Sequence, residues 1–186
     1  MTTYESWHCP GADADGFVSV EFLEDRASQL TRDQFIEEFP VPALLVVLPE
    51  ADQLRVRSDL DSDDHVQLLT VSVRSSMTLR YLNRVAFICK RPGNRFAHLV
   101  SVGRSRSNDI SIAVDSISKV HGYFAQDEEA WAFTDHSSTN GSQLNSQVLP
   151  SGEKALLHDG DFLRLGLEVT LEYLSPERLY DRARHR

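Results

Sequence analysis

The chain has 186 residues, of which 41% are hydrophobic and 25% are charged, so its composition is that of a globular protein that can bury a core. Its net charge is −9 and its isoelectric point is near 5.2, which argues against nucleic-acid binding because that function relies on basic residues that neutralise phosphates. The sequence has no run of about 18 apolar residues, so we expect no membrane-spanning segment.

The first 16 residues combine Pro10, Gly11 and Gly16 with short polar side chains, which predicts an irregular start. They lack the basic and apolar segments that direct secretion. The two cysteines, Cys9 and Cys89, are far apart in the sequence and do not have the paired spacing of a zinc site or a disulfide framework. We therefore expect a cytoplasmic protein without a bound metal.

The next two segments predict a strand and a helix. Apolar residues alternate over residues 17–23, which is typical of a strand. Within residues 30–39, Thr31 is a potential helix cap and Gln34 stands three residues later, which is the pattern of a capping box and predicts a short helix. Pro40 ends this segment, because proline cannot continue a helix.

Three further segments follow before residue 80. The apolar run 43–48 lies between two prolines and predicts a buried strand or a sheet edge. Residues 59–64 form an acidic stretch that lacks the glycine and the final glutamate of a calcium loop, so a solvated loop is favoured. Residues 66–74 alternate again and predict a strand.

The charges divide the chain into two parts. Residues 1–80 carry 15 acidic and 6 basic residues, whereas residues 81–186 carry 13 of each, so the whole excess of −9 belongs to the first part. We therefore expect two units with different roles. The first, residues 1–80, is a small acidic α+β region whose role the sequence does not indicate.

The second unit, residues 81–186, contains short β-like runs separated by turn residues, which favours a mainly β fold, a sandwich of two sheets. The expected strands lie within residues 84–90, 98–103, 108–114, 121–126, 130–135, 154–161, 162–166 and 168–174. A short C-terminal helix is then predicted, because Ser175 can cap it and Pro176 suits its first position.

Polar residues gather where these expected strands end. The segments are Val102-Gly103-Arg104-Ser105 with Ser107-Asn108-Asp109-Ile110, Ile117-Ser118-Lys119-Val120-His121, residues 135–142 and residues 157–166. A phosphate group has nearly two negative charges and three acceptor oxygens. Arg104 offers a planar fork of donors and Lys119 a second charge, while Ser118, Thr139 and Asn140 offer neutral donors. These residue types together predict a phosphate-binding site on loops.

In this order and spacing the motifs resemble those of the forkhead-associated (FHA) domain family, over roughly residues 84–173. The resemblance implies an FHA-like β-sandwich of two sheets with recognition loops at one end and a phosphothreonine peptide as ligand. It implies that Arg104, Ser118 and Lys119 contact the phosphate. Lys119 stands where many members have Arg or Asn, so a bidentate contact is lost there.

The resemblance also assigns roles to the neighbouring residues. Thr139 supports the phosphate and forms, with Asn140, a shallow pocket for the threonine methyl group, while Asn140 binds the peptide backbone. Gly103, His121 and Gly141 are architectural: a tight backbone, a buried polar brace between loops and a turn with positive φ.

No motif of a hydrolase, a zinc protease or a nucleotide-binding loop is present, so we expect a binding protein that is not an enzyme and needs no cofactor. The expected partner is a phosphothreonine-containing protein or peptide, either a Ser/Thr kinase or its substrate. An alternative is a phosphate-independent scaffold that binds partners through residues 1–80. In a third possibility, a phosphorylated threonine of the first half, such as Thr2 or Thr3, occupies the chain's own site. The oligomeric state stays open.

Overall fold

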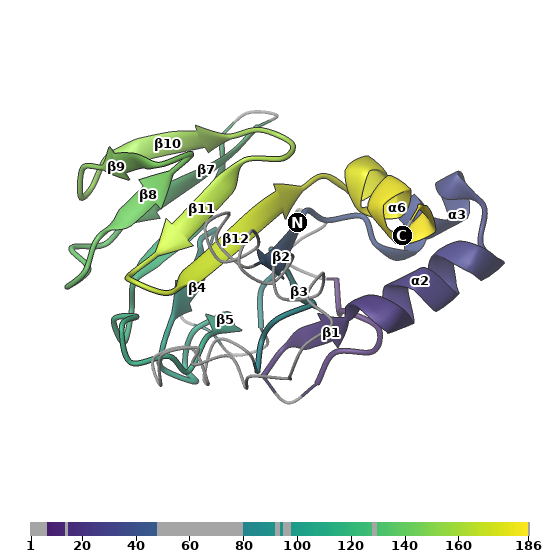
Figure 1. The fold of residues 1–186 in the computed structure, drawn as a ribbon, viewed down its shortest axis with the longest axis horizontal. Coiled ribbons are helices and arrows are strands. Elements are labelled where there is room, and N and C mark those ends of the chain that lie inside the picture. The colour runs from purple at the N-terminus through teal and green to yellow at the C-terminus, as the bar shows by residue number, and fades with distance from the viewer. Residues whose placement is uncertain are drawn as a thin grey trace, which may run out of the picture.

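The computed structural model describes residues 7–13, 15–47, 80–91, 94, 98–127 and 130–185. Two β-sheets face each other and three helices lie beside one end of them (Figure 1). No helix among these residues is long and apolar enough to cross a membrane. The predicted acidic loop at 59–64 and the predicted strand at 66–74 lie outside the described residues.

The larger sheet has seven strands, and all of its pairings are antiparallel. In spatial order they are β1 (Phe17–Ser19), β3 (Arg84–Phe87), β2 (Ala43–Val47), β12 (Val169–Leu174), β11 (Phe162–Leu165), β8 (Ser142–Leu144) and β9 (Gln147–Leu149).

The smaller sheet has five strands, and one of its pairings, between β4 and β5, is parallel. In spatial order they are β10 (Lys154–Leu157), β7 (Ala130–Asp135), β6 (Gly122–Asp127), β4 (Val100–Gly103) and β5 (Ile110–Ser111). Side chains of both sheets meet in one core, where Phe124 and Phe133 of the smaller sheet and Leu163 and Leu171 of the larger one are fully buried. This arrangement confirms the predicted mainly β fold of two sheets.

Strand β2 lies inside the larger sheet although it belongs to the acidic first part of the chain. It is hydrogen-bonded to β12 on one side, with Val46 opposite Leu171, and to β3 on the other, with Leu44 opposite Ala86. The predicted strand at 43–48 is therefore confirmed. The larger sheet crosses the predicted boundary between residues 80 and 81, because it contains β1 and β2 from before this boundary together with strands from after it.

The predicted strand at 17–23 is wrong after Ser19, because helix α2 (Val20–Gln29) begins there. Ser19 is its N-cap, and the Ser19 Oγ accepts a hydrogen bond from the N–H of Phe22 at 3.2 Å. Val20 and Leu23 of this helix are buried together with Ala27. That spacing of three and seven residues is helical, and it prevails over the short alternation at 18, 20 and 22.

The two other helices begin as the sequence predicts. Helix α3 (Arg32–Glu38) has both bonds of the capping box, since Thr31 Oγ1 accepts from the N–H of Gln34 at 3.4 Å and Gln34 Oε1 accepts from the N–H of Thr31 at 3.0 Å. Helix α6 (Pro176–Arg184) is capped by Ser175. Helix α6 packs against α2 and α3, so the three helices form one layer.

Most strands predicted between residues 84 and 174 are confirmed, but the hairpin β8–β9 falls in a segment where we predicted no strand. Asn145 and Ser146 at its tip have φ values of 49° and 69°. Positive φ at both central residues is the requirement of a two-residue hairpin turn whose twist matches its strands. This hairpin extends the larger sheet beyond β11.

Candidate functional site

Three loops meet beside the ends of the strands: residues 104–109 between β4 and β5, residues 112–121 between β5 and β6, and residues 136–141 between β7 and β8. The N–H of Arg104 donates to the carbonyl of Ser118 at 2.8 Å. The same Ser118 accepts, through Oγ, the N–H of Thr139 at 3.0 Å. The structure therefore brings the predicted phosphate-binding residues of all three loops together.

Arg104 is exposed, and one nitrogen of its guanidinium group is held by a backbone carbonyl. Its Nε donates to the carbonyl of Ile117 at 3.2 Å. Its Nη1 lies 3.9 Å from Oδ1 of Asp115, whose side chain is 99% exposed. Such an exposed ion pair contributes less than about 1 kcal/mol, so the terminal guanidinium nitrogens can exchange it for an anionic ligand.

Lys119 is exposed next to this arginine, and its backbone is fixed by the neighbouring loop. Its carbonyl accepts the N–H of Ser105 at 3.1 Å and the Nδ2 of Asn108 at 2.7 Å. The backbone of Lys119 is therefore held in place while its side chain is exposed. The loops of the site thus carry exposed cations, Arg104 and Lys119 among them.

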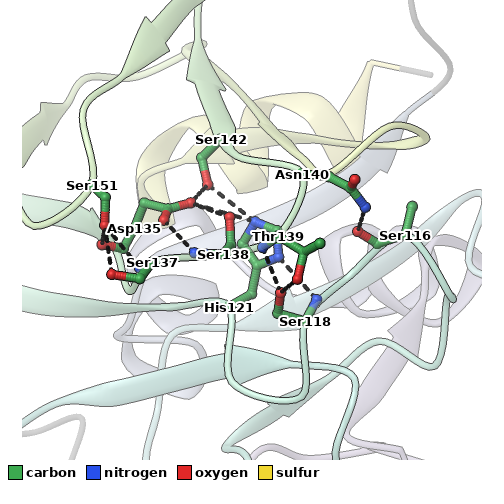
Figure 2. Close-up of polar contacts among 10 residues, drawn as sticks. All are labelled: Ser116, Ser118, His121, Asp135, Ser137, Ser138, Thr139, Asn140, Ser142 and Ser151. Atoms are coloured by element: carbon green, nitrogen blue, oxygen red, sulfur yellow. Dashed lines mark hydrogen bonds and ion pairs between the residues drawn. The ribbon is translucent and has the colours of Figure 1, made fainter.

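Ser118 and Thr139 form a pair of hydroxyl groups, as Figure 2 shows. The Oγ of Ser118 donates to Oγ1 of Thr139 at 3.3 Å. Thr139 is only the acceptor in this bond, so its own hydroxyl hydrogen can be donated to a ligand. The pair presents a neutral donor beside the two cations.

Asn140 is exposed, but one of its N–H groups is already used. Its Nδ2 donates to the carbonyl of Ser116 at 2.8 Å (Figure 2). Among the described residues, its Oδ1 has no hydrogen-bond partner. Asn140 can accept a peptide N–H through that oxygen without breaking the bond to Ser116, while a bond to a peptide carbonyl requires its second N–H.

His121 is fully buried and links two of the loops. Its Nδ1 accepts the N–H of Ser118 at 3.2 Å, so its proton is on Nε2, which lies 3.1 Å from Oγ of Ser142 (Figure 2). Burial lowers the pKa of His121 below its ordinary value, although the nearby Asp135 carboxylate opposes this effect. The imidazole is therefore a neutral brace.

Asp135 is a central residue of the site that the sequence analysis missed. Its Oδ2 accepts hydrogen bonds from Oγ of Ser138 at 2.6 Å and from Oγ of Ser142 at 2.5 Å, and its Oδ1 accepts the N–H of Ser138 at 2.9 Å. Burial by itself raises the pKa of Asp135, but these hydrogen bonds outweigh burial and lower it. An Asp followed by a Ser three residues later is the available sequence signal, since such pairs close local turns.

The comparison with known families adds one decisive finding to this geometry. Residues 100–166 match the model of the FHA domain. The chain contains an FHA domain. FHA domains are a family of phosphothreonine-binding modules, and the matched segment includes all of the residues that the sequence predicts for the site.

Individual proteins are similar over parts of the chain. An E3 ubiquitin-protein ligase, rnf8 of Danio rerio, is 32% identical over 92 residues, which are 44% of this chain and 19% of that protein. The chain therefore spans about a fifth of the length of this curated relative.

Solved structures of FHA domains are also similar. The FHA domain of an Arabidopsis thaliana hypothetical protein covers 73% of this chain and 85% of its own, with 23% identity and a TM-score of 0.46. The N-terminal FHA domain of S. cerevisiae Rad53p, solved in complex with a phosphothreonine peptide, covers 45% and 73%, with 22% identity and a TM-score of 0.40.

Gly103 and Gly141 of the FHA domain are glycines for different reasons. A Cβ on Gly103 would lie 2.6 Å from the carbonyl oxygen of Lys119 and 2.9 Å from the backbone nitrogen of His121, so only glycine fits between the two loops. A Cβ on Gly141 would meet no atom, but its φ is +72°, which side chains rarely adopt.

Asp109 is a second important residue to which the sequence analysis gave no role. Its fully buried carboxylate accepts hydrogen bonds from Nζ of Lys90 at 2.9 Å, from the N–H of Arg91 at 2.8 Å and from the N–H of Ser101 at 2.8 Å. The carboxylate therefore ties the loop that carries Arg104 to the segment after β3. Among the described residues, no cluster of His, Cys, Asp and Glu is arranged to hold a metal ion.

Proposed function

We propose that the protein is a phosphothreonine-dependent binding protein, an adaptor in Ser/Thr kinase signalling that reads a phosphorylated partner through the loops of its FHA domain. The observation that supports this most is that the guanidinium of the exposed Arg104 is bound to the carbonyl of Ile117, directly before Ser118, whose hydroxyl pairs with that of Thr139. The proposed partner is a Ser/Thr kinase or its substrate, and the proposed location is the cytoplasm.

The charges of the site suit a phosphate group. A phosphothreonine carries nearly two negative charges, and Arg104 and Lys119 are two exposed cations on adjacent loops. Displacing the contact between Arg104 and Asp115 costs little, because that ion pair is exposed and 3.9 Å long. The hydroxyl of Thr139 then donates to a phosphate oxygen, and Asn140 accepts from the peptide backbone through Oδ1.

The network contains the three residue types of a hydrolytic triad, namely His121, Ser142 and Asp135. Their arrangement, however, supports binding without catalysis. The Ser142 side chain is 1% exposed, so a substrate has no access to its hydroxyl. The Oγ of Ser142 lies between the imidazole of His121 and the carboxylate of Asp135. In a hydrolytic triad the order differs, because the histidine lies between the serine and the aspartate and the serine faces the substrate. We therefore propose that this network braces the loops and that the protein acts by binding alone.

The test begins with a library of peptides that share a fixed phosphothreonine between degenerate flanks. The tightest peptide is then titrated calorimetrically against the wild-type chain and the Arg104→Ala and Asn140→Ala variants. We expect Arg104→Ala to weaken binding at least about 30-fold, which is ~2 kcal/mol, because it removes charge-assisted hydrogen bonds. We expect Asn140→Ala to weaken it about tenfold.

Arg178→Ala is the matched control, since Arg178 is an exposed arginine on helix α6. Its affinity should stay within about twofold of the wild-type value. The unphosphorylated peptide should show no measurable binding. Equal affinity for both forms of the peptide, or unchanged affinity in both site variants, would contradict the proposed function and favour phosphate-independent scaffolding.

A further inference from the structure

Tyr81 lies outside the segment that matches the FHA family, yet it contacts a loop of the site. Its hydroxyl oxygen accepts a hydrogen bond from the N–H of Ala113 at 3.1 Å. The tyrosine is only 2% exposed, so this bond is shielded from water. Ala113 belongs to the loop 112–121, which carries Ser118 and Lys119 a few residues later.

This loop has little regular structure to hold its start. Strand β5 before it has only two residues, Ile110 and Ser111. After it, the N–H of Ile112 donates to the carbonyl of Gly103 at 3.0 Å, and the N–H of Val114 donates back to Ile112 itself at 2.8 Å. The hydroxyl of Tyr81 therefore supplies a partner from another part of the fold at the point where the strand pairing ends.

The position of the hydroxyl is fixed from the N-terminal side of the chain. The ring of Tyr81 packs against that of Phe17 on strand β1, with centroids 5.0 Å apart. The carbonyl of Tyr81 accepts the N–H of Arg84 at 3.1 Å at the start of β3. Phe17 is also buried. Strands β1 and β3 thus determine where the hydroxyl meets the loop.

Hydrogen bonds continue from this point to the phosphate-binding residues. The N–H of Ile117 donates to the carbonyl of Val114 at 3.0 Å, which closes a turn directly after Ala113. The carbonyl of Ile117 then holds Nε of Arg104 at 3.2 Å. A displacement of the loop at Ala113 therefore moves both the support of Arg104 and the hydroxyl of Ser118, which follows Ile117.

We propose that Tyr81 is a positioning residue for phosphothreonine binding, which it supports by holding the loop 112–121 through the N–H of Ala113. This inference rests on the proposed function of the loops. It gives the segment before residue 100 a specific role in ligand binding, because β1 and β3 place the tyrosine.

Tyr81→Phe tests the proposal, because it removes the hydroxyl and keeps the ring that packs on Phe17. Tyr180→Phe is the matched control, since Tyr180 packs on Phe35 in the helical layer. Two quantities are measured in each full-length variant: the affinity for the phosphothreonine peptide selected from the library, and the hydrogen-exchange rates of backbone amides by NMR.

We expect Tyr81→Phe to weaken binding about three- to tenfold, as the loss of one shielded hydrogen bond would do. We also expect faster exchange of the amides of residues 113–119, while amides of the core strands keep their rates. Tyr180→Phe should leave the affinity and the exchange of these loop amides unchanged.

An affinity within about twofold of the wild-type value in Tyr81→Phe would overturn the positioning role. Exchange that rises equally throughout the protein would also overturn it, since this indicates a merely structural residue. A wild-type chain that binds no phosphothreonine peptide contradicts the proposed function instead, and the exchange rates of the loop then decide separately whether Tyr81 holds it.

Discussion

The loops of the candidate site (residues 104–109, 112–121 and 136–141) and the helical layer lie at opposite ends of strand β12 and are stabilised by different interactions. At the start of β12, the turn containing Gly166 donates a hydrogen bond to Gly141, and the loops there are joined by polar groups. At the other end, helix α6 follows directly, and aromatic rings dominate the contacts. Phe35 and Phe39 are both fully buried there.

The loop end of β12 mainly fixes the positions of polar groups, whereas the helical end mainly contributes stability. A hydrogen bond contributes little net free energy but depends strongly on direction, so the polar end is suited to holding donors in place for a ligand. Buried rings contribute several kcal/mol each but do not depend on one orientation. We therefore expect substitutions in the helical layer to lower stability, and substitutions among the loops to lower affinity as well.

The largest expected effect on stability is that of Phe39→Ala in the helical layer. Phe39 stacks on Phe87 with centroids 5.5 Å apart and lies 4.8 Å from the ring of Phe35. Truncation leaves a cavity in this cluster, so the free energy of unfolding should fall by about 3–5 kcal/mol in urea titrations. The affinity of the folded variant for the phosphothreonine peptide should not change.

Glu37→Ala on the exposed side of α3 is the control for this variant and should change the free energy of unfolding by less than about 0.5 kcal/mol. If the folded Phe39→Ala variant binds the phosphothreonine peptide more weakly than the wild-type chain, then the two ends of β12 are coupled. The helical layer would then affect affinity as well as stability, which contradicts this prediction.

A smaller effect, of about 1–3 kcal/mol, is expected for Gly103→Ala at the loops, because the added methyl group would overlap backbone atoms of Lys119 and His121. The loops must move apart, so the affinity for the phosphopeptide should fall as well. Gly141→Ala provides the comparison, since its methyl group has open space and only the positive φ opposes it. A Gly103→Ala variant with wild-type affinity would show that the spacing of these loops does not matter for binding.

The smallest effect concerns pH. The pKa of His121 in the folded state lies below its ordinary value of 6.5 because the ring is buried. The unfolded chain therefore binds a proton near pH 6.5 that the folded chain does not, and stability should decrease as the pH falls below that value. Stability lost through the depressed pKa of Asp135 should appear only below its ordinary value of 3.8.

The measurement is the free energy of unfolding between pH 7.5 and about 4.5. His121→Gln should reduce the slope in this range, because it removes the group whose pKa is lowered by burial. An unchanged dependence of the free energy of unfolding on pH in His121→Gln would mean that His121 is not the group that titrates.

Local signals explain what could be predicted from the sequence. The capping box of Thr31 and Gln34 and the cap at Ser175 each depend on residues within one helical turn, and both helices begin there. The strand patterns after residue 84 are also local. Helix α2 was missed because Val20 and Phe22 alternate with polar residues. This stretch is too short to distinguish the two-residue period of a strand from the 3.6-residue period of a helix.

Long-range contacts explain what could not be predicted. The place of β2 in the sheet depends on β12, which lies near the other end of the chain. The roles of Asp109 and Asp135 depend on burial and on donors from several loops, and a carboxylate in a sequence carries no sign of either. Arg104, Ser118 and Thr139 could be predicted to meet because their motifs resemble those of a family.

The most direct test of the account is an NMR titration of the uniformly ¹⁵N-labelled chain with the selected phosphothreonine peptide and with its unphosphorylated form. The account predicts saturable shifts of the amides of Arg104, Ser118, Thr139 and their neighbours with the phosphorylated peptide, and no shifts with the unphosphorylated one. The amides of α2, α3 and α6 should not move. Equal shifts with both peptides, or shifts confined to the helical layer, would contradict it.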